Sequence, residues 1–578
     1  MKTFLMLMLV LLCSFATAGT YYCSTSGLSI YPYTNAVMAG TNMYAVAQAM
    51  NTVGDNSGNI IIVAEGIFPC RAVKLQKDVS IKGTGPATTI LDGGWVAGNS
   101  VLSSPWLYNI NLEVTDVTIQ HGTASTGYYS GLSGGGLAVD RANSVVLKNC
   151  VIADNGDSST HFGGGIAAGP ADVTAIDCVF SNNMALHSGG GVWIYNNSSS
   201  SFTRCIFEGN MISLAFEGMG GAGGGLDADA TDSSLSLTVD SCIFRNNISG
   251  LGGGLYLSAR HGNSSVRNCL FQNNWALGSA GSSVGGGIMG GIVDCVGILE
   301  LSHLTITGNH ADYYAGGIKF GGGRTYLENS IIWGNSAPTN ENWQVKDIDL
   351  IPHSISYYRG SIICSYMLVV PLIEDPRQFY NVSYVCTSPL TNRVEWQSCI
   401  DTNPMFVTSD CKLDWSSPCV GVCPVTTTTN DMRGYPRPIP GKTGTDMGCW
   451  EMANPVSDYI GDNIPTWWKE RYGLNVFGIS SADLDFDNDS VGNYSEWIAD
   501  TDPTNNLSYL HINKIFKSTN TVLFFTASSN RTYTIMSSSN LVSWTTVLTN
   551  LNLAGASQVA VPVQSVPEYY RVRARMNY

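Results

Sequence analysis

Hydrophobic and polar residues alternate along this chain in short runs rather than in long helical stripes. Residues 144–147 and 235–239 are examples of such runs. Alternation at every second residue is typical of a β-strand, whereas an amphipathic helix repeats its apolar positions every three or four residues. Across the repeats no run of helical length with the helical period occurs. The pattern therefore predicts a body built from many short strands.

A glycine cluster followed by an aliphatic residue recurs seven times between residues 134 and 318, at spacings of 26 to 34 residues. After each cluster comes an aliphatic or aromatic residue with Asn three positions further on. These pairs are Ile152/Asn155, Phe180/Asn183, Phe207/Asn210, Phe244/Asn247, Phe271/Asn274, Ile306/Asn309 and Ile332/Asn335. A period of this length indicates stacked units, in which each strand pairs with its equivalent one turn away.

The phased polar residues predict how the turns are joined. Aligned Asn side chains fit a ladder, in which each one hydrogen-bonds the next turn and satisfies backbone groups at a corner. A column of cysteines has the same phase: Cys150, Cys178, Cys205, Cys242 and Cys269. Equivalent side chains on adjacent turns lie about 4.8 Å apart, beyond the ~3.8 Å between Cβ atoms that a disulfide prefers. We therefore expect buried free thiols in this column.

The remaining cysteines of the mature chain do not follow the repeat and are better disulfide candidates. They are Cys23, Cys70, Cys364, Cys386, Cys399, Cys411, Cys419, Cys423 and Cys449. No pair has the Cys-x-x-Cys spacing, so a zinc site is not expected.

Two further stretches carry a resemblance to known families. Residues 59–94 resemble the opening turns of pectin-lyase-like right-handed β-helix proteins, and residues 403–451 resemble the closing segment of many bacterial β-helix proteins. The glycine and Phe-x-x-Asn pairing is similar to the repeats of chlamydial polymorphic outer-membrane proteins. The resemblance implies an all-β fold, a right-handed parallel β-helix over residues 19–451. It does not select an activity, because such proteins include lyases, hydrolases, esterases and non-enzymes.

Composition and the first residues predict export. Residues 1–18 have the lysine, the apolar stretch and the small-residue cleavage site of a signal peptide, and no later run is long and apolar enough to span a membrane. The net charge of −15 makes nucleic acid and anionic membrane surfaces unsuitable partners. We expect a secreted or cell-surface protein, from a bacterium if the resemblance holds.

After residue 451 the sequence no longer has the composition and spacing of the β-helix region. Residues 464–474 predict a short helix, with Pro near its start and Gly near its end. Oxygen-bearing residues then follow at the spacing of a calcium loop: Asp485, Asp487, Asp489, the Val491 carbonyl, Asn493 and Glu496. The stretch resembles calcium-binding, thrombospondin-type-3-like linkers of secreted bacterial proteins, although Ser490 stands where Gly is usual. We expect a structural Ca²⁺ in a helical linker at 452–506, then a small antiparallel β-sandwich-like domain at 507–578.

A possible binding surface lies in the segments between each Asn and the next glycine cluster, which should stack as loops on one face. Their candidate ligand-binding residues are Asp157, His161, His187, Glu217, Trp275, Asp312, Tyr313 and Tyr314, with His310 beside them. Aromatic rings and carboxylates on a rigid face suit glycan contact, and the alternative is ordinary loop decoration.

Two functions remain open at this point. The first is a non-catalytic adhesin or polysaccharide-binding scaffold, which would contact an extracellular polysaccharide or cell-surface glycan. The second is an extracellular polysaccharide lyase or glycoside hydrolase. No cluster matches the catalytic signatures of pectate lyases, polygalacturonases or pectinesterases, so no catalytic residue is assigned.

Overall fold

The computed structural model divides the chain into two compact units, Met1–Met452 and Ala453–Tyr578. The expected signal peptide at 1–18 lies outside the described residues. These are 19–105, 107–124, 133–139, 141–195, 199–213, 221–278, 286–292, 298–312, 315–320, 324–337, 348–349, 355–358, 361–364, 379–387, 402–425, 428–529, 531–562 and 569–576. Within them no helix has both the length and the apolarity needed to cross a membrane.

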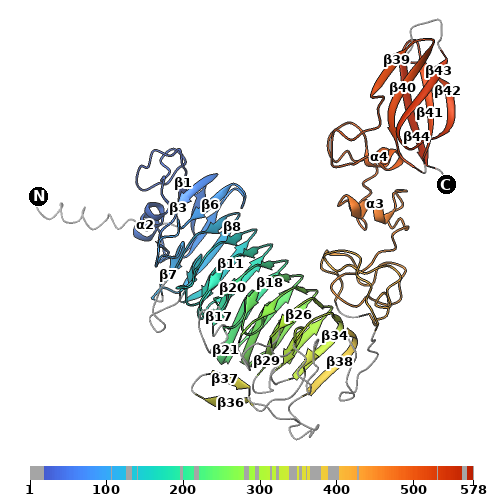
Figure 1. The fold of residues 1–578 in the computed structure, drawn as a ribbon. Coiled ribbons are helices and arrows are strands. Elements are labelled where there is room, and N and C mark those ends of the chain that lie inside the picture. Colours follow the sequence, from blue (N-terminus) through green and yellow to red (C-terminus); the bar gives the residue numbers. More distant parts are fainter. Residues whose placement is uncertain are drawn as a thin grey trace, which may run out of the picture. The chain divides into compact units, whose positions relative to one another are not determined.

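The first unit is a parallel β-helix, which confirms the expected all-β fold (Figure 1). Its opening turns contain one helix, whose buried Met43, Val46 and Met50 join the apolar interior. The opening elements are β1 (Thr20–Cys23), α2 (Met43–Val53), β2 (Asn59–Val63), β3 (Gly66–Pro69), β4 (Val73–Lys74), β5 (Val79–Lys82), β6 (Thr89–Asp92), β7 (Leu102–Ser104), β8 (Ile110–Thr115) and β9 (Thr118–Gln120).

Each later turn begins with a strand directly after the glycine cluster. These strands belong to a parallel sheet of ten, and alternate residues such as Leu226 and Ala228 point inward to the core. They are β10 (Leu137–Val139), β13 (Ile166–Ala168), β17 (Val192–Tyr195), β21 (Leu226–Ser234), β25 (Leu255–His261), β29 (Ile288–Ile292) and β33 (Ile318–Phe320).

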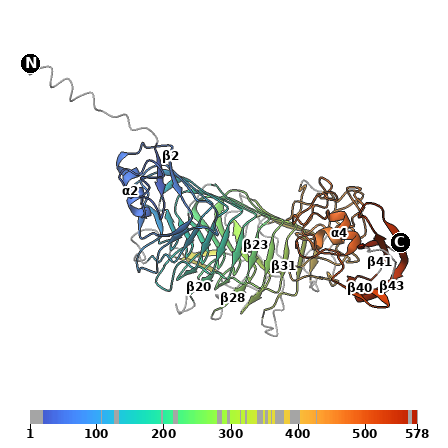
Figure 2. The same cartoon turned by 90° about the horizontal axis from the view of Figure 1, so that it is seen from above.

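Two further strands of each turn belong to a second sheet, of 21 strands. The first of the two is, from one turn to the next, β11 (Ala142–Lys148), β14 (Asp172–Ile176), β18 (Ser199–Thr203), β22 (Ser236–Asp240), β26 (Ser264–Arg267), β30 (Ile298–Ser302) and β34 (Arg324–Trp333). The second is β12 (Val151–Ala153), β15 (Val179–Ser181), β19 (Ile206–Glu208), β23 (Ile243–Arg245), β27 (Leu270–Gln272) or β31 (Thr305–Thr307), and the end of β34 takes this place in the last repeat. Seen from above, the turns follow one another along the axis (Figure 2).

A short fourth strand follows the Asn of five turns, where only loops were expected. These strands are β16 (Met184–Ala185), β20 (Met211–Ile212), β24 (Ile248–Ser249), β28 (Trp275–Ala276) and β32 (His310–Ala311), and they form a five-stranded parallel sheet. In each pair the second residue faces inward and is buried: it is apolar in four of the strands, as at Ala276, and is Ser249 in β24.

The Asn ladder is confirmed. Asn210 is fully buried, and its Nδ2 donates to Asn247 Oδ1 at 3.0 Å and to the Phe180 carbonyl at 2.8 Å. Its Oδ1 accepts from the Asn183 backbone N–H and side-chain Nδ2, at 3.1 and 2.9 Å. The residue before each ladder position is left-handed, as at Gly209 with φ of +64°. The ladder thus supplies partners for backbone groups where the chain turns a corner.

The glycine clusters are required by close backbone approach. A Cβ on Gly191 would lie 2.5 Å from the Gly225 carbonyl oxygen and 3.0 Å from Cγ of Asn210. The Gly189 backbone is left-handed, with φ of +65°. Any larger residue at these places would push neighbouring turns apart.

The interior columns are also as expected. Phe207 stacks on Phe244 with ring centroids 4.5 Å apart, and Phe244 stacks on Phe271 at 4.6 Å. The column from Cys150 to Cys269 consists of buried free thiols. Burial raises the pKa of the Cys242 thiol well above its usual range, so this thiol stays uncharged.

The expectation of disulfides is wrong for five of the cysteines that do not follow the repeat. Cys23, Cys70, Cys411, Cys423 and Cys449 are buried with free thiols. They lie in apolar clusters and act as small hydrophobic residues there, which spacing along the sequence could not reveal. Cys419 is also buried. The side chains of Cys364, Cys386 and Cys399 lie outside the described residues.

The stack continues to β38 and is covered on its side by the closing segment. The last strands are β35 (Ile348–Asp349), β36 (Ile355–Tyr358), β37 (Ser361–Cys364) and β38 (Phe379–Thr387). Residues 402–452 pack against the outer face of β27, β31 and β34, with the Cys449 N–H donating to Thr305 Oγ1 at 3.1 Å. A fully buried ion pair, Arg437 to Glu451 at 2.9 Å, holds the segment together.

The second unit contains two short helices and two antiparallel sheets. The helices are α3 (Thr466–Arg471) and α4 (Asn493–Ala499). The strands are β39 (Lys514–Lys517), β40 (Asn520–Ala527), β41 (Arg531–Ser538), β42 (Thr545–Asn552), β43 (Gly555–Pro562) and β44 (Tyr569–Met576), in the orders β39-β40-β43 and β42-β41-β44. Phe525 and Tyr533 pack between the sheets, as the expected antiparallel β-domain requires.

Candidate functional site

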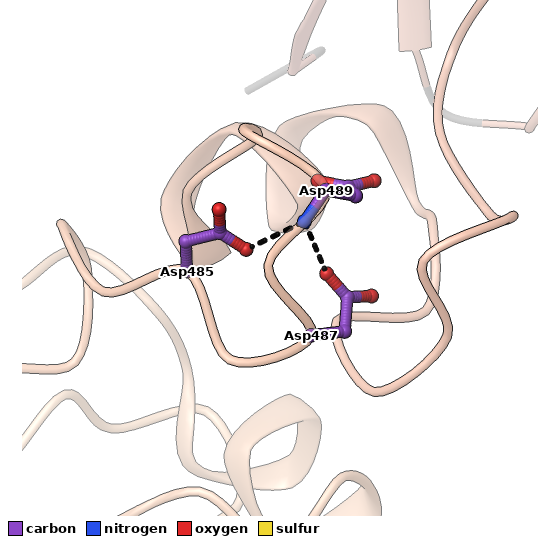
Figure 3. Close-up of side chains that lie close together, drawn as sticks. All are labelled: Asp485, Asp487 and Asp489. Carbon is purple, nitrogen blue, oxygen red and sulfur yellow. Dashed lines mark hydrogen bonds between the residues drawn. The ribbon is translucent and has the colours of Figure 1, made fainter.

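The loop before α4 brings three of the expected metal ligands together. One carboxylate oxygen of each of Asp485, Asp487 and Asp489 lies within 4.8 Å of the others (Figure 3). The Asp489 N–H donates to Oδ1 of Asp485 at 3.1 Å and to Oδ1 of Asp487 at 3.3 Å. The Ser490 N–H donates to Asp485 Oδ2 at 2.8 Å, with Ser490 left-handed at φ of +74°. The backbone therefore folds so that the carboxylates converge.

Glu496, in the first turn of α4, adds a fourth carboxylate to this cluster. Its side chain is fully buried, and one oxygen, Oε2, has no hydrogen-bond partner among the described residues. Burial, then the charges of Asp487 and Asp489, raise the pKa of Glu496 to about 7. The pKa of Asp487 is raised as well, by burial and then by the charge of Asp489. The ionised forms of Asp487 and Glu496 are thus disfavoured by the neighbouring carboxylates.

The donor set fits a calcium ion. Within the described part of the chain, the buried Oδ2 atoms of Asp487 and Asp489 and Oδ1 of Asn493 also lack hydrogen-bond partners. Asn493 is held in place because its Nδ2 donates to the Ser481 carbonyl at 2.8 Å. A hard cation that accepts six to eight oxygen ligands would satisfy such atoms together. The role of the Val491 carbonyl stays a prediction, although the Val491 N–H holds Asp489 Oδ1 at 2.7 Å.

The expected glycan-facing residues divide into separate groups. Asp157 closes its own loop, because its Oδ1 accepts from the Ser159 and Thr160 N–H groups at 2.8 and 3.0 Å. His161 and His187 lie together on adjacent turns, with ring centroids 5.1 Å apart. Burial, then the charge of His161, lowers the pKa of His187. Glu217, Tyr313 and Tyr314 lie outside the described residues.

Trp275 forms the centre of a second group. It is 43% exposed, and its ring lies 4.9 Å from that of His310 on the next turn. His310 Nε2 lies 3.2 Å from Asp312 Oδ1, and its Nδ1 lies 2.8 Å from Ser336 Oγ. This group is about 14 Å along the stack from His187, because three turns of about 4.8 Å separate them.

A matching group, missed in the sequence, lies in the opening turns. Trp95 is 51% exposed and stacks on His121 at 5.1 Å, and His121 Nδ1 lies 3.1 Å from Asp92 Oδ2. Burial raises the pKa of Asp92, but hydrogen bonds from Gln120 and Gly94 and the charge of His121 give a net lowering. Each group thus combines an exposed Trp, a His from the next turn and an Asp.

The two tryptophans stand at the same distance along the chain from aligned strand residues. Asp92 aligns through successive strand pairings with Gln272, and each tryptophan stands three residues later. Six turns lie between them, which is about 29 Å along the stack. The sequence alone does not indicate the similarity of the two groups, because the first group lies outside the repeats that begin with a glycine cluster.

A buried acid on the outer face of the ten-stranded sheet was also missed. Asp227 is 1% exposed and lies between Trp193 and Tyr256 of the neighbouring strands. Burial first, and then the charge of Asp229, raise its pKa well above the usual range, against a hydrogen bond with Ser188. Its Oδ1 has no hydrogen-bond partner among the described residues. Strand alternation could have identified it, because Asp227 sits between the inward-facing Leu226 and Ala228.

Comparison with known proteins addresses the fold alone. Residues 106–291 match the family model described as a right-handed β-helix region. No curated protein matches the chain significantly. The matched region and the long parallel sheets are those of a right-handed β-helix repeat protein.

Proposed function

We propose that this protein is an extracellular, non-catalytic β-helix that binds polysaccharide, as an adhesin or as a scaffold at the cell surface. The observation that carries the proposal is the presence of two groups along the stack that each combine an exposed Trp, a His and an Asp. An exposed Trp ring offers a flat apolar face to a sugar ring, and a carboxylate beside it accepts hydrogen bonds from hydroxyls.

The spacing of the groups favours an extended ligand. About 29 Å separates Trp95 from Trp275, and each ring contacts a His from the next turn, stacked for Trp95 and tilted for Trp275. His121 and His310 are in turn held by Asp92 and Asp312. Rings that are already ordered lose little conformational entropy on binding, so a chain that reaches both groups would gain from each.

The test is binding of the mature chain to a panel of uronic-acid and neutral polysaccharides by affinity electrophoresis. We expect Trp95→Ala and Trp275→Ala each to weaken retardation, and the double variant to abolish it. Trp415→Ala is the matched control, because Trp415 is 38% exposed but lies in the closing segment. Equal binding by the double variant and the control would refute the proposal.

We further propose that Ca²⁺ occupies the loop at 485–496 in a structural role. The support is the convergence of Asp485, Asp487 and Asp489, together with buried oxygens of Asp487, Asp489 and Glu496 that lack partners among the described residues. Asp485, Asp487, Asp489, Asn493 and Glu496 would hold the ion through side chains, and Val491 through its carbonyl. The ion would neutralise the mutual repulsion of the acids and so stabilise the start of α4.

A second candidate function, glycan cleavage, is favoured by Asp227 alone. A buried carboxyl group with a raised pKa has the chemistry of a general acid, and Trp193 and Tyr256 lie on the two neighbouring strands. Asp229 follows on the same face of β21 as a possible second carboxylate. Release of reducing or unsaturated ends by the native chain, lost in Asp227→Asn, would establish this function in place of the first.

A further inference from the structure

The loop before α3 repeats the backbone of the calcium loop before α4. In both, the fourth and sixth positions are left-handed. The φ angles are +72° and +61° in the loop at 458–469, and +62° and +74° in the loop at 485–496. The residues concerned are Gly461, Asn463, Asn488 and Ser490. The two loops carry different residues at both of these positions, so they are alike in backbone conformation rather than in sequence.

The Asp at the first position accepts the same backbone hydrogen bond in both loops. The Asn463 N–H donates to Asp458 Oδ2 at 2.5 Å, as the Ser490 N–H donates to Asp485 Oδ2 at 2.8 Å. The same holds at the fifth position. There Asp462 Oδ1 accepts from the Ile464 N–H at 3.1 Å, as Asp489 does from the Val491 N–H.

Both helices also begin in the same way, at the ninth position. The Thr466 N–H donates to the Ser457 carbonyl at 2.9 Å, and the Asn493 N–H donates to the Leu484 carbonyl at 2.8 Å. In each loop the acceptor is the residue directly before the first Asp. The two segments are therefore one loop–helix unit used twice.

The twelfth position is where the two units differ in chemistry. The second unit has Glu496, with an oxygen that lacks a partner, whereas the first has Lys469. Lys469 is 1% exposed, and its Nζ lies 2.6 Å from Asp462 Oδ1 and 3.3 Å from Asp458 Oδ1. The third position differs as well, because Ile460 replaces an acid. The first loop thus holds two carboxylates and an ammonium group, and the second holds four carboxylates.

We infer that the Lys469 ammonium takes the place of a metal ion in the first loop, so that this unit forms without calcium and only the second loop binds it. The inference rests on the proposed calcium site. A tethered cation neutralises Asp458 and Asp462 at every calcium concentration, whereas the second loop depends on an ion from solution. Only α4 and the side chains packed on it would then respond to calcium removal.

The test exchanges the tethered cation for a ligand. Calcium stoichiometry of the mature full-length chain is measured by isothermal titration calorimetry, with Glu496→Gln identifying the ion bound at the second loop. We expect Lys469→Glu, with Ile460→Asp to restore the third position, to bind one more ion than the native chain. Lys517→Glu makes the same charge change on an exposed strand residue and should add none.

The outcomes separate the two proposals. A folded Ile460→Asp/Lys469→Glu chain with unchanged stoichiometry overturns the inference. A native chain that loses no ion on Glu496→Gln overturns the proposed calcium site instead. If the double variant is unstable, its melting temperature is compared with and without calcium. We expect calcium to raise the melting temperature of Ile460→Asp/Lys469→Glu. The melting temperature of Lys469→Gln should be lowered as well, but calcium should not raise it. Equal responses of the two variants would also overturn the inference.

Discussion

The Asn column of the β-helix and the acidic loop before α4 both bury polar side chains, but they satisfy them differently. In the column, each Asn donates to and accepts from groups of adjacent turns, as Asn210 does with Asn183 and Asn247. In the loop, buried oxygens of Asp487, Asp489 and Glu496 lack hydrogen-bond partners among the described residues. The first arrangement is complete within the chain, whereas the second leaves oxygens that the proposed calcium ion would satisfy. Burial of polar atoms therefore indicates a binding site only where their partners are missing.

The largest expected effect is the loss of one ladder residue. Asn210→Ala leaves the Phe180 carbonyl and the Asn183 N–H without partners in a dry interior, so we expect a destabilisation of about 3–5 kcal/mol. Urea unfolding followed by tryptophan fluorescence would measure it. Asn143→Ala, at an exposed position, should cost less than about 0.5 kcal/mol. Similar midpoints for both variants would show that the ladder is not what stabilises the turns.

The second-largest effect on stability is expected from calcium binding, and it should concern the second unit only. An ion at a hundred times its Kd would stabilise that unit by about 2.7 kcal/mol. Glu496→Gln should remove most of this gain, because it replaces the buried carboxylate with a neutral amide. Thermal unfolding with calcium and with a chelator provides the measurement. A calcium effect that persists in Glu496→Gln would place the ion elsewhere.

The same loop should depend on pH in a way that the ladder does not. With its pKa raised from 4.5 to about 7, the Glu496 carboxyl favours the folded metal-free state below pH 4.5, and this contribution is lost as pH rises through about 7. Calcium binds the carboxylate, so its affinity should increase over the same range. Titrations at pH 5.5 and 8 would reveal this, and equal affinities at both would contradict it.

The cysteine column should respond more weakly. Cys205→Ala removes one buried sulfur from a stack that keeps its other members, and we expect about 1 kcal/mol of destabilisation. Because the thiols of the column are buried, they should resist alkylation in the folded protein and react in urea. Mass spectrometry of iodoacetamide-treated protein would report both states. Rapid labelling of Cys205 without denaturant would argue against a closed interior.

The smallest effect is expected from the charged pairs on the outside of the turns. Lys148 Nζ lies 2.9 Å from Glu113 Oε1, but both side chains are at least one-third exposed. Lys148→Ala should therefore change the unfolding free energy by less than about 1 kcal/mol. A loss as large as that of Asn210→Ala would mean that surface charge, rather than the ladder, joins the turns.

The repeat could be predicted because each structural role returns at a fixed phase. Phe207, Asn210 and Gly191 have equivalents in nearly every turn, so their shared role is visible along the sequence. The convergence of the acidic side chains before α4 was predictable for a related reason, since Asp485, Asp487 and Asp489 follow a local spacing. Both signals depend on residues close together in sequence or on repetition.

What could not be predicted depends on contacts between turns or on burial that occurs once. Trp95 and His121 meet only because β6 and β9 are adjacent in the stack, and no repeat marks them. Cys411 and Cys449 are irregular in spacing, yet they pack in an apolar cluster against Leu270 rather than forming disulfides. The expected loop face was partly wrong because buried residues such as Ala276 turn the start of each loop into a strand.

The ladder also has a consequence for how such a protein can change in length. Each Asn bonds only to its immediate neighbours, so an insertion or deletion of one whole turn leaves every remaining junction chemically the same. Removal of the 27 residues from one ladder position to the next would join Asn183 to the surroundings that Asn210 now has. Gene duplication or recombination within this region could therefore lengthen or shorten the protein in steps of one turn, without redesign of either end.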